Sequence, residues 1–187
     1  MKRLFALALA MLLTLSLTAC GGQGNDAKPS STSQEDPAST QADNTAPSPA
    51  ANSKYVLTYK DCPLPMNADF APLLAFLGEP DSYFEAASCA FDGLDKTYTY
   101  AGLEIITYPD EDVDRISSVR ILDGSVSTPE GVTVGLSQAE VTAAYGEDYD
   151  EVGLQYAYED GDTILSILFD GDTAVSVEYT AINDLLG

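Results

Sequence analysis

The chain of 187 residues contains no histidine and no tryptophan. The missing histidine excludes Ser-His-Asp and Cys-His catalytic sites, an imidazole general base and histidine-ligated zinc. No glycine-rich loop of the kind that cradles phosphates is present either. The 30 acidic residues can supply carboxylate pairs, so the composition does not exclude a glycosidase-like catalytic pair. A domain this small offers little room for a deep cleft, however, and we expect a protein that is not an enzyme, with no catalytic residues and no cofactor.

Basic side chains are scarce, because eight lysines and arginines stand against 30 acidic residues and leave a net charge of −22. After Tyr55 the only basic residues are Lys60, Lys96, Arg115 and Arg120. Such a charge repels the phosphates of nucleic acids and of anionic lipid headgroups, so we expect no nucleic-acid partner. The acidity serves either to keep a surface protein soluble or to attract a cationic partner or calcium.

The chain has no apolar run long enough to cross a bilayer with ease. Its longest, LFALALAMLLTLSLTA at residues 4–19, is just short of the roughly 17 to 25 residues that a spanning helix needs. Lys2 and Arg3 precede this run, which ends in the small residues Thr18 and Ala19 before Cys20, and this is typical of an N-terminal secretory signal. We therefore expect residues 1–19 to be a signal peptide.

The end of this segment, Leu17-Thr18-Ala19-Cys20, resembles the lipobox of bacterial lipoproteins. The resemblance implies cleavage before Cys20 and acylation of the Cys20 thiol, with palmitate among the attached chains. Two or more acyl chains give a stable attachment to a bilayer. The implied location is the extracytoplasmic face of the cell membrane, where the protein is held by its lipid.

Residues 21–54 contain no Val, Ile, Leu, Met or aromatic residue. A segment of this composition cannot bury a core, so we expect residues 20–54 to be the lipidated cysteine followed by a disordered linker. Apolar residues return at Tyr55, where YVLTYK alternates as a strand does. The folded domain is expected at residues 55–187.

A short helix is predicted within GLSQAEVTAAYGEDYD, residues 135–150. Ser137 followed by Glu140 matches the capping box that begins a helix, and Gly146 can take the left-handed conformation that ends one. An earlier stretch, DFAPLLAFLGEPDSY, matches it, with Asp69 at the position of Ser137 and Gly78 at the position of Gly146. Two helices are therefore expected.

Three short strands are predicted after each helix. The segments after the first helix are TYTYAG, LEIITYPDED and ISSVRIL, and those after the second are QYAYEDG, TILSILFDGD and AVSVEYT. We predict an α+β fold of two tandem helix-plus-antiparallel-three-strand repeats that share one core, at about residues 69–122 and 137–180. The first repeat is the longer one between its helix and its first strand, and Cys89 lies in this insertion.

This order of elements resembles the β-lactamase-inhibitor-protein fold, which has tandem helix-plus-sheet units, and the small lipoprotein of the outer-membrane assembly complex. Proteins of these families act by binding other proteins, which implies a non-enzymatic protein-binding or scaffolding module with an extracytoplasmic protein partner. None of their contact residues can be matched to this sequence. The alternative is a ligand- or cation-binding envelope accessory module of a transport or cell-wall system.

Two cysteines, Cys62 and Cys89, remain once Cys20 is assigned to the lipid. In an exported domain two cysteines suggest one disulfide, here joining the segment before the first helix to the insertion after it. The alternative is two free thiols.

Asp110, Asp112 and Asp114 have the spacing of the first calcium ligands in an EF-hand loop. That loop also needs glycine at its sixth position and a bidentate glutamate at its twelfth, which are Arg115 and Ile121 here. We therefore expect an acidic turn between strands and no metal site.

Two Tyr-x-Tyr strands are predicted, with Tyr98 and Tyr100 in one and Tyr156 and Tyr158 in the other. Each pair lies on one face of its strand because side chains alternate. The four tyrosines are core residues if that face meets the helices, and a partner-binding patch if it faces outward.

Overall fold

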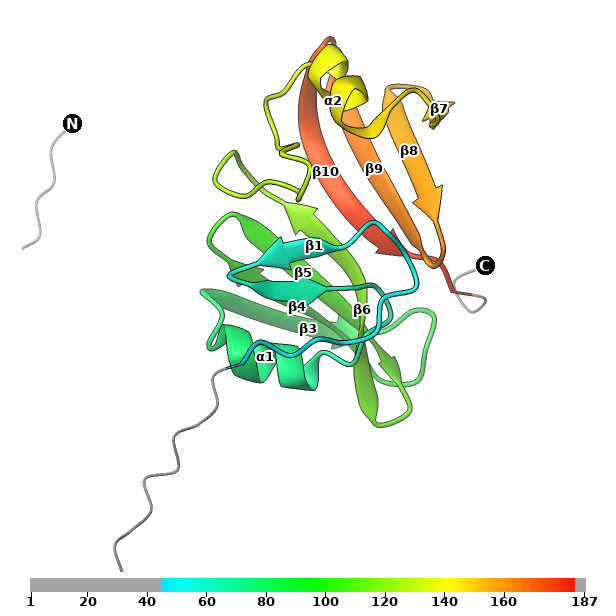
Figure 1. The fold of residues 1–187 in the computed structure, drawn as a ribbon. Helices are drawn as coiled ribbons and strands as arrows, with labels where there is room; N and C mark the ends of the chain where they lie inside the picture. Colours follow the sequence, from blue (N-terminus) through cyan, green and yellow to red (C-terminus); the bar gives the residue numbers. More distant parts are fainter. Residues whose placement is uncertain (1–44, 184–187) are drawn as a thin grey trace, which may run out of the picture. The chain divides into compact units, whose positions relative to one another are not determined.

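The computed structural model describes residues 45–183. They form one eight-stranded antiparallel sheet and a small two-stranded hairpin, with two short helices (Figure 1). The strand order of the sheet is β3-β4-β5-β6-β10-β9-β8-β7, so β6 and β10 join its two halves. Its strands are β3 (Ser82–Ala87), β4 (Leu94–Tyr100), β5 (Leu103–Asp110), β6 (Val113–Ile121), β7 (Asp150–Val152), β8 (Gln155–Asp160), β9 (Thr163–Asp170) and β10 (Thr173–Ala181).

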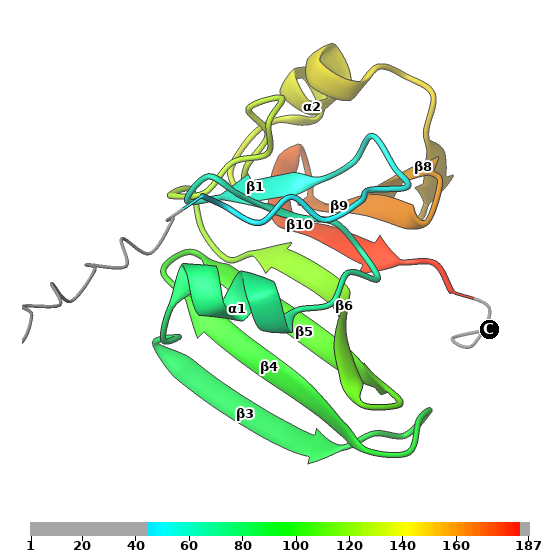
Figure 2. The same ribbon diagram turned by 60° about the horizontal axis from the view of Figure 1, so that its bottom comes forward.

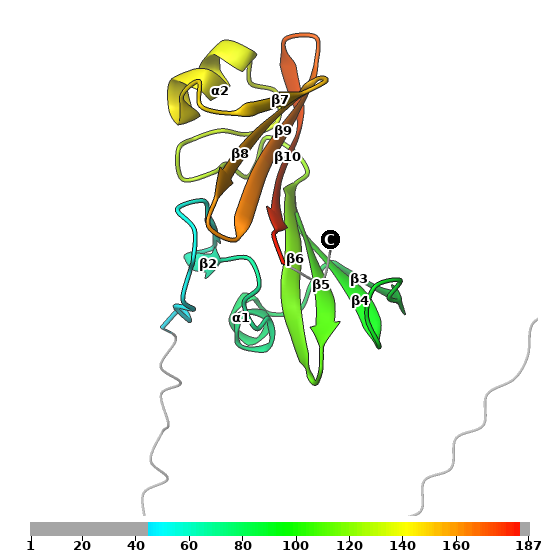
Figure 3. The same ribbon diagram turned by 90° about the vertical axis from the view of Figure 1, so that its right-hand side faces the viewer.

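All other elements lie on one side of this sheet. They are helix α1 (Ala71–Leu77), helix α2 (Gln138–Tyr145) and the hairpin of β1 (Leu57–Tyr59) and β2 (Cys62–Leu64). Figure 3 shows both helices and the hairpin on the same side, and Figure 2 shows α1 along the β4–β6 half while α2 belongs to the β8–β10 half. Within residues 45–183, neither helix is long and apolar enough to cross a bilayer.

The ends of α2 are those that its sequence predicts. Ser137 Oγ accepts a hydrogen bond from the N–H of Glu140, and the Glu140 carboxylate accepts one from the N–H of Ser137, which completes the capping box. The helix ends at Gly146, whose φ of 87° lies in the region that glycine occupies without strain. In α1 the N-cap is Phe70, one residue after the expected Asp69, and the Asp69 carboxylate accepts a hydrogen bond from the N–H of Ala71.

The core lies between the inner face of the sheet and these covering elements. Alternate residues of each strand are buried there, because side chains of a strand point to opposite faces. Register places one buried row across six strands, made of Tyr98, Ile105, Val119, Tyr179, Leu165 and Tyr158. Phe70 and Leu73 from the α1 region and Val141 from α2 pack into the same core.

The segment before β1 is attached to the turn between β8 and β9. The side-chain amide of Asn52 donates to the Asp162 carboxylate at 3.2 Å, and the N–H of Lys54 donates to Asp160 at 2.7 Å. Gly161 lies so close that an added Cβ would come 1.7 Å from the carbonyl oxygen of Asn52. The folded part therefore includes residues from Asn52 onward, slightly before the predicted boundary at Tyr55.

The structure corrects the predicted fold class. The described residues are mostly β, and four strands follow each helix where three were predicted. All eight strands belong to one continuous sheet. The prediction of an α+β fold of helix-plus-three-strand repeats is wrong because it missed β3 and β7, the two edge strands. The predicted signal peptide of residues 1–19, the predicted lipidation site Cys20 and most of the predicted linker lie outside the described residues.

Candidate functional site

The sheet face opposite the helices is uncovered by any element that the structure describes (Figure 3). We call it the open face and define it by two rows of side chains that the strand register places side by side. The first row crosses all eight strands and consists of Ser82, Thr99, Glu104, Arg120, Glu178, Ser166, Ala157 and Asp150. The second consists of Phe84, Thr97, Ile106, Ser118, Thr180, Ile164 and Glu159.

An ion-pair triad occupies the centre of the open face. The Arg120 guanidinium on β6 donates to Glu104 on β5 at 3.3 Å and to Glu178 on β10 at 3.2 Å. Direct cross-strand neighbours of opposite charge stabilise a sheet, and this triad spans the junction between its two halves. All three side chains remain partly accessible to solvent, so each pair contributes little to stability, about 1 kcal/mol or less.

Short hydroxyl side chains surround this triad. Thr97, Thr99, Thr180 and Ser166 are all half-buried, as expected for short side chains on the surface of a sheet. Ser118 is 7% exposed, and its Oγ has no hydrogen-bond partner among the described residues. Buried hydroxyls without a partner are uncommon in folded proteins, and this one lies below the accessible surface of the open face.

The charge of the open face is negative apart from Arg120. Glu104, Glu178, Glu159 and Asp150 all belong to its rows. The other basic side chains of the sheet are engaged elsewhere in ion pairs, Lys96 with Asp114 at 2.6 Å and Arg115 with Asp110 at 2.5 Å. Arg120 is thus the one basic side chain within the two rows.

The four tyrosines proposed as a partner-binding patch are in the core. Tyr98, Tyr100, Tyr156 and Tyr158 are only 1–8% exposed, so of the two alternatives the structure shows core residues and not a partner-binding patch. The physical reason is that their strand face meets the helices. The hydroxyls of Tyr100 and Tyr158 donate to the carbonyl oxygens that end the helices, those of Gly78 at 3.0 Å and Gly146 at 3.1 Å.

Burial changes the acidity of these hydroxyls. It raises the pKa of Tyr100 and the pKa of Tyr158 to about 12, because the charged phenolate is disfavoured away from water. The Tyr156 hydroxyl donates instead to the side-chain oxygen of Gln138 in α2, and Tyr98 packs against Phe70. Each Tyr-x-Tyr strand therefore attaches a helix to the sheet.

The predicted disulfide is not formed in the structure. Cys62 lies in β2 with its thiol buried in the core, and Cys89 lies exposed in the turn between β3 and β4. Both are free thiols. Burial raises the pKa of the Cys62 thiol, which keeps it in its unreactive protonated form.

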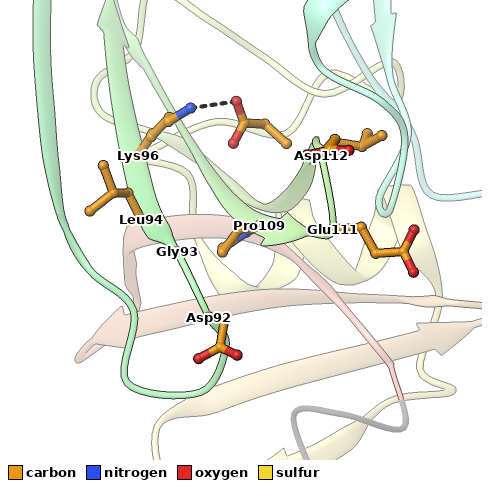
Figure 4. A pocket seen from close by; sticks show the side chains of 9 residues that line it. Asp92, Gly93, Leu94, Lys96, Pro109, Glu111 and Asp112 are labelled. Carbon is orange, nitrogen blue, oxygen red and sulfur yellow. Dashed lines mark hydrogen bonds and ion pairs between the residues drawn. The ribbon is translucent and has the colours of Figure 1, made fainter.

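The acidic turn of Asp110, Asp112 and Asp114 borders a shallow pocket of about 210 Å³. Two of its three carboxylates are used in ion pairs, Asp110 with Arg115 and Asp114 with Lys96. Figure 4 shows Lys96 directed at a carboxylate, while Asp92 and Glu111 lie apart from it. Among residues 45–183 no three His, Cys, Asp or Glu side chains are grouped so that they could hold a metal ion.

Sequence reasoning did not identify the open face. Its signal is the alternation in AVSVEYT, where Ser176, Glu178 and Thr180 alternate with Val175, Val177 and Tyr179. That alternation alone does not tell whether loops or helices cover the polar side. The placement of both helices and the hairpin on the other side is a tertiary property.

Comparison with known proteins gave no family assignment. No family model matches the chain. No curated protein matches it either. Among solved structures, an extracellular protein containing an SCP domain from Bacillus anthracis matches 65% of this chain at 17% identity, with a TM-score of 0.47. The match spans 45% of that protein's length. A DUF4309 family protein from Bacillus subtilis matches 63% of this chain, and 82% of its own length is covered, at 19% identity and a TM-score of 0.39.

Proposed function

We propose that this chain is a lipid-anchored, extracytoplasmic protein-binding module without enzymatic activity, and that its partner binds to the open face. The observation that carries the proposal is the uncovered face of an eight-stranded sheet, with a row of side chains that runs across every strand. Such a surface is wide, and the hydrogen-bonded ladders between its strands hold it rigid. Rigid, preorganised surfaces lose less entropy when a protein binds to them.

The side chains of the open face suit protein recognition. Threonine, serine and alanine are short, so ordering them costs little conformational entropy compared with lysine or glutamate. The accessible hydroxyls of Thr97, Thr99, Ser166 and Thr180 can donate and accept hydrogen bonds. Ile106 and Ile164 add apolar area within the second row, where a partner would exclude water.

The charge of the open face specifies the chemistry of the partner. Its rows carry more carboxylates than the single Arg120 can neutralise, so a protein with lysines or arginines on its contact surface would be attracted. The net charge of −22 extends this attraction over the whole molecule and speeds encounter with a basic partner. We therefore infer a partner protein with a basic surface.

The anchor and the linker explain how such a module would be presented. An acylated Cys20 would hold the chain at the membrane, and residues 21–54 would act as a tether. A flexible chain of this length has an r.m.s. span of about 30 Å, enough to let the domain meet partners away from the bilayer surface.

Photo-cross-linking in intact cells tests the binding surface. A photoreactive amino acid replaces Thr99 or Ser166 on the open face, with matched controls at Ala75 of α1 and Ala143 of α2, which are exposed on the other side. We expect both open-face positions to capture the same protein and both helix positions to leave it uncaptured. Capture of that protein with equal yield from the helices, or from no open-face position, would contradict the proposal.

The anchor is tested separately by the variant Cys20→Ser. We expect the unaltered chain to remain with the membrane fraction and to carry acyl chains by mass spectrometry, and the variant to lack them. An unaltered chain without acyl chains would exclude the lipid anchor. The proposal that the partner binds to the open face would then still be tested by the cross-linking experiment.

A further inference from the structure

The two edges of the eight-stranded sheet differ in how they are protected (Figure 1). β7 at one edge has three residues, and two of them, Asp150 and Glu151, are acidic. β3 at the other edge has six residues, all with exposed side chains. It contains no proline, lysine or arginine, and its register against β4 has no bulge. Short length, charge, proline and bulges are the devices that protect sheet edges from pairing, so β7 is well protected, whereas β3 has only the single charge of Glu85.

We propose that β3 is a dimerisation strand, which pairs antiparallel with β3 of a second copy and joins the two sheets into one. This inference goes beyond the proposed binding of a partner at the open face and does not depend on it. Its support comes from the backbone of β3, from its side chains and from the protection of the opposite edge.

The backbone of β3 has hydrogen-bonding groups available at this edge. The N–H of Ser88 donates to the carbonyl of Gly93 at 3.0 Å, which marks a hydrogen-bonded pair at the end of the β3–β4 ladder. Such pairs alternate along an antiparallel ladder. The backbone groups of Tyr83, Glu85 and Ala87 therefore point away from β4, towards the side where no described strand lies.

The side chains select one register for the pairing. A two-fold axis at Phe84 places Tyr83 opposite Glu85 of the second copy, and both residues have outward backbone groups. The Tyr83 hydroxyl already donates to the Glu85 carboxylate within one chain, so the same donor and acceptor can bond across the interface. A shift by one pair in either direction places Glu85 opposite a second Glu85 or opposite Asp81. Like charges that face each other across strands are destabilising, so these registers are disfavoured.

The pairing also buries the aromatic side chains that the monomer leaves exposed. Phe84 is 65% exposed and Tyr83 48% exposed in the single chain. On the two-fold axis the two Phe84 rings become neighbours on the open face. Because only one edge is unprotected, pairing closes after two copies and does not continue into a fibre.

Disulfide trapping tests the register in the full chain. The background variant Cys89→Ser removes the exposed thiol of the described residues. Phe84→Cys then places two thiols across a non-hydrogen-bonded pair, whose Cα atoms are about 4.5 Å apart in an antiparallel ladder. The control Ala86→Cys lies on the same strand and face but would be opposite Ser82. Under mild oxidation, we expect Phe84→Cys to form the disulfide-linked dimer at least tenfold faster than Ala86→Cys. Equal rates for the two variants, or no linked dimer with Phe84→Cys, would overturn the proposal.

Light scattering of the full chain in detergent tests pairing with the native strand. Glu85→Pro removes an outward N–H and leaves the ladder to β4 in place, whereas Glu85→Gln keeps that N–H. We expect the native chain and the glutamine variant to have the mass of a dimer and the proline variant that of a monomer, all with cooperative thermal unfolding. A monomeric native chain at micromolar concentration, or a proline variant as dimeric as the native chain, would overturn the proposal.

Discussion

At the scale of single residues, the two tyrosine hydroxyls that bind helix ends explain how each helix is fixed to the sheet. A helix leaves its last carbonyl groups without partners in the helix. Tyr100 supplies a donor to the carbonyl of Gly78 and Tyr158 supplies one to that of Gly146, at nearly the same distance. The same device therefore serves both helices.

Removal of either hydroxyl should destabilise the domain. We expect Tyr100→Phe and Tyr158→Phe each to lower the free energy of unfolding by about 1 kcal/mol, because a carbonyl group loses its donor while the ring still packs. Urea unfolding of the two variants measures this. A variant as stable as the native chain would show that water replaces the lost donor at that helix end.

At the scale of elements, local signals in the sequence predicted the helix ends and the central strands, whereas the edges required the tertiary structure. Ser137, Glu140 and Gly146 act on their own helix, so their roles could be predicted from spacing alone. β3 has no alternation of apolar and polar residues because both its faces are exposed. β7 has only three residues and gives no periodic signal.

The candidate site was predicted less well than the fold elements, for a related reason. Alternation showed that Tyr98 and Tyr100 share a face, but the placement of α1 decides that this face is buried. The disulfide was inferred from the number of cysteines, which says nothing of the direction of the Cys62 side chain into the core. Neither fact follows from local sequence.

The attachment of the N-terminal segment to the β8–β9 turn gives a prediction at this scale. Gly161→Ala should destabilise the domain more than Gly171→Ala in the next turn. Both glycines have positive φ, 59° and 63°, so both variants bear the same backbone strain, which exceeds about 1 kcal/mol. Only the Gly161 variant also collides with Asn52, since nothing lies within 4 Å of the added Cβ at Gly171.

Thermal unfolding of the two glycine variants measures the difference. A larger loss for Gly161→Ala assigns the excess to the contact with the segment before β1. Equal losses would show that this segment is displaced without cost and does not stabilise the domain.

At the scale of the whole molecule, the acidity of the chain and its buried tyrosines set its response to pH. There is no histidine to titrate near neutrality. Burial raises the pKa of Tyr100 and of Tyr158 from an ordinary value of about 10 to about 12. The folded state therefore favours the neutral hydroxyl more than the unfolded state does.

The sign of the alkaline effect follows from these shifts. The stabilising contribution is fully present below pH 10, where both states hold the proton. It decreases as the pH rises above 10, because the unfolded chain ionises first, and it is lost as the pH passes through 12. We expect the free energy of unfolding to fall between pH 10 and 12, as measured by urea unfolding along that range, and to fall less steeply in Tyr158→Phe. If the free energy of unfolding fell as steeply with pH in Tyr158→Phe as in the native chain, the alkaline effect could not be assigned to the buried Tyr158 hydroxyl.

The central claim is that a basic partner binds to the open face. The most direct test is to measure how tightly the partner captured by photo-cross-linking binds to the full chain. Thr99→Lys adds a positive charge and bulk to the open face, and Ala75→Lys makes the same kind of change on the exposed side of α1. We predict that Thr99→Lys weakens binding about tenfold or more and that Ala75→Lys changes it less than about twofold, with the native affinity falling as salt is added. Equal affinities for the native chain and Thr99→Lys, or an equal loss in Ala75→Lys, would contradict the assignment of the partner to the open face.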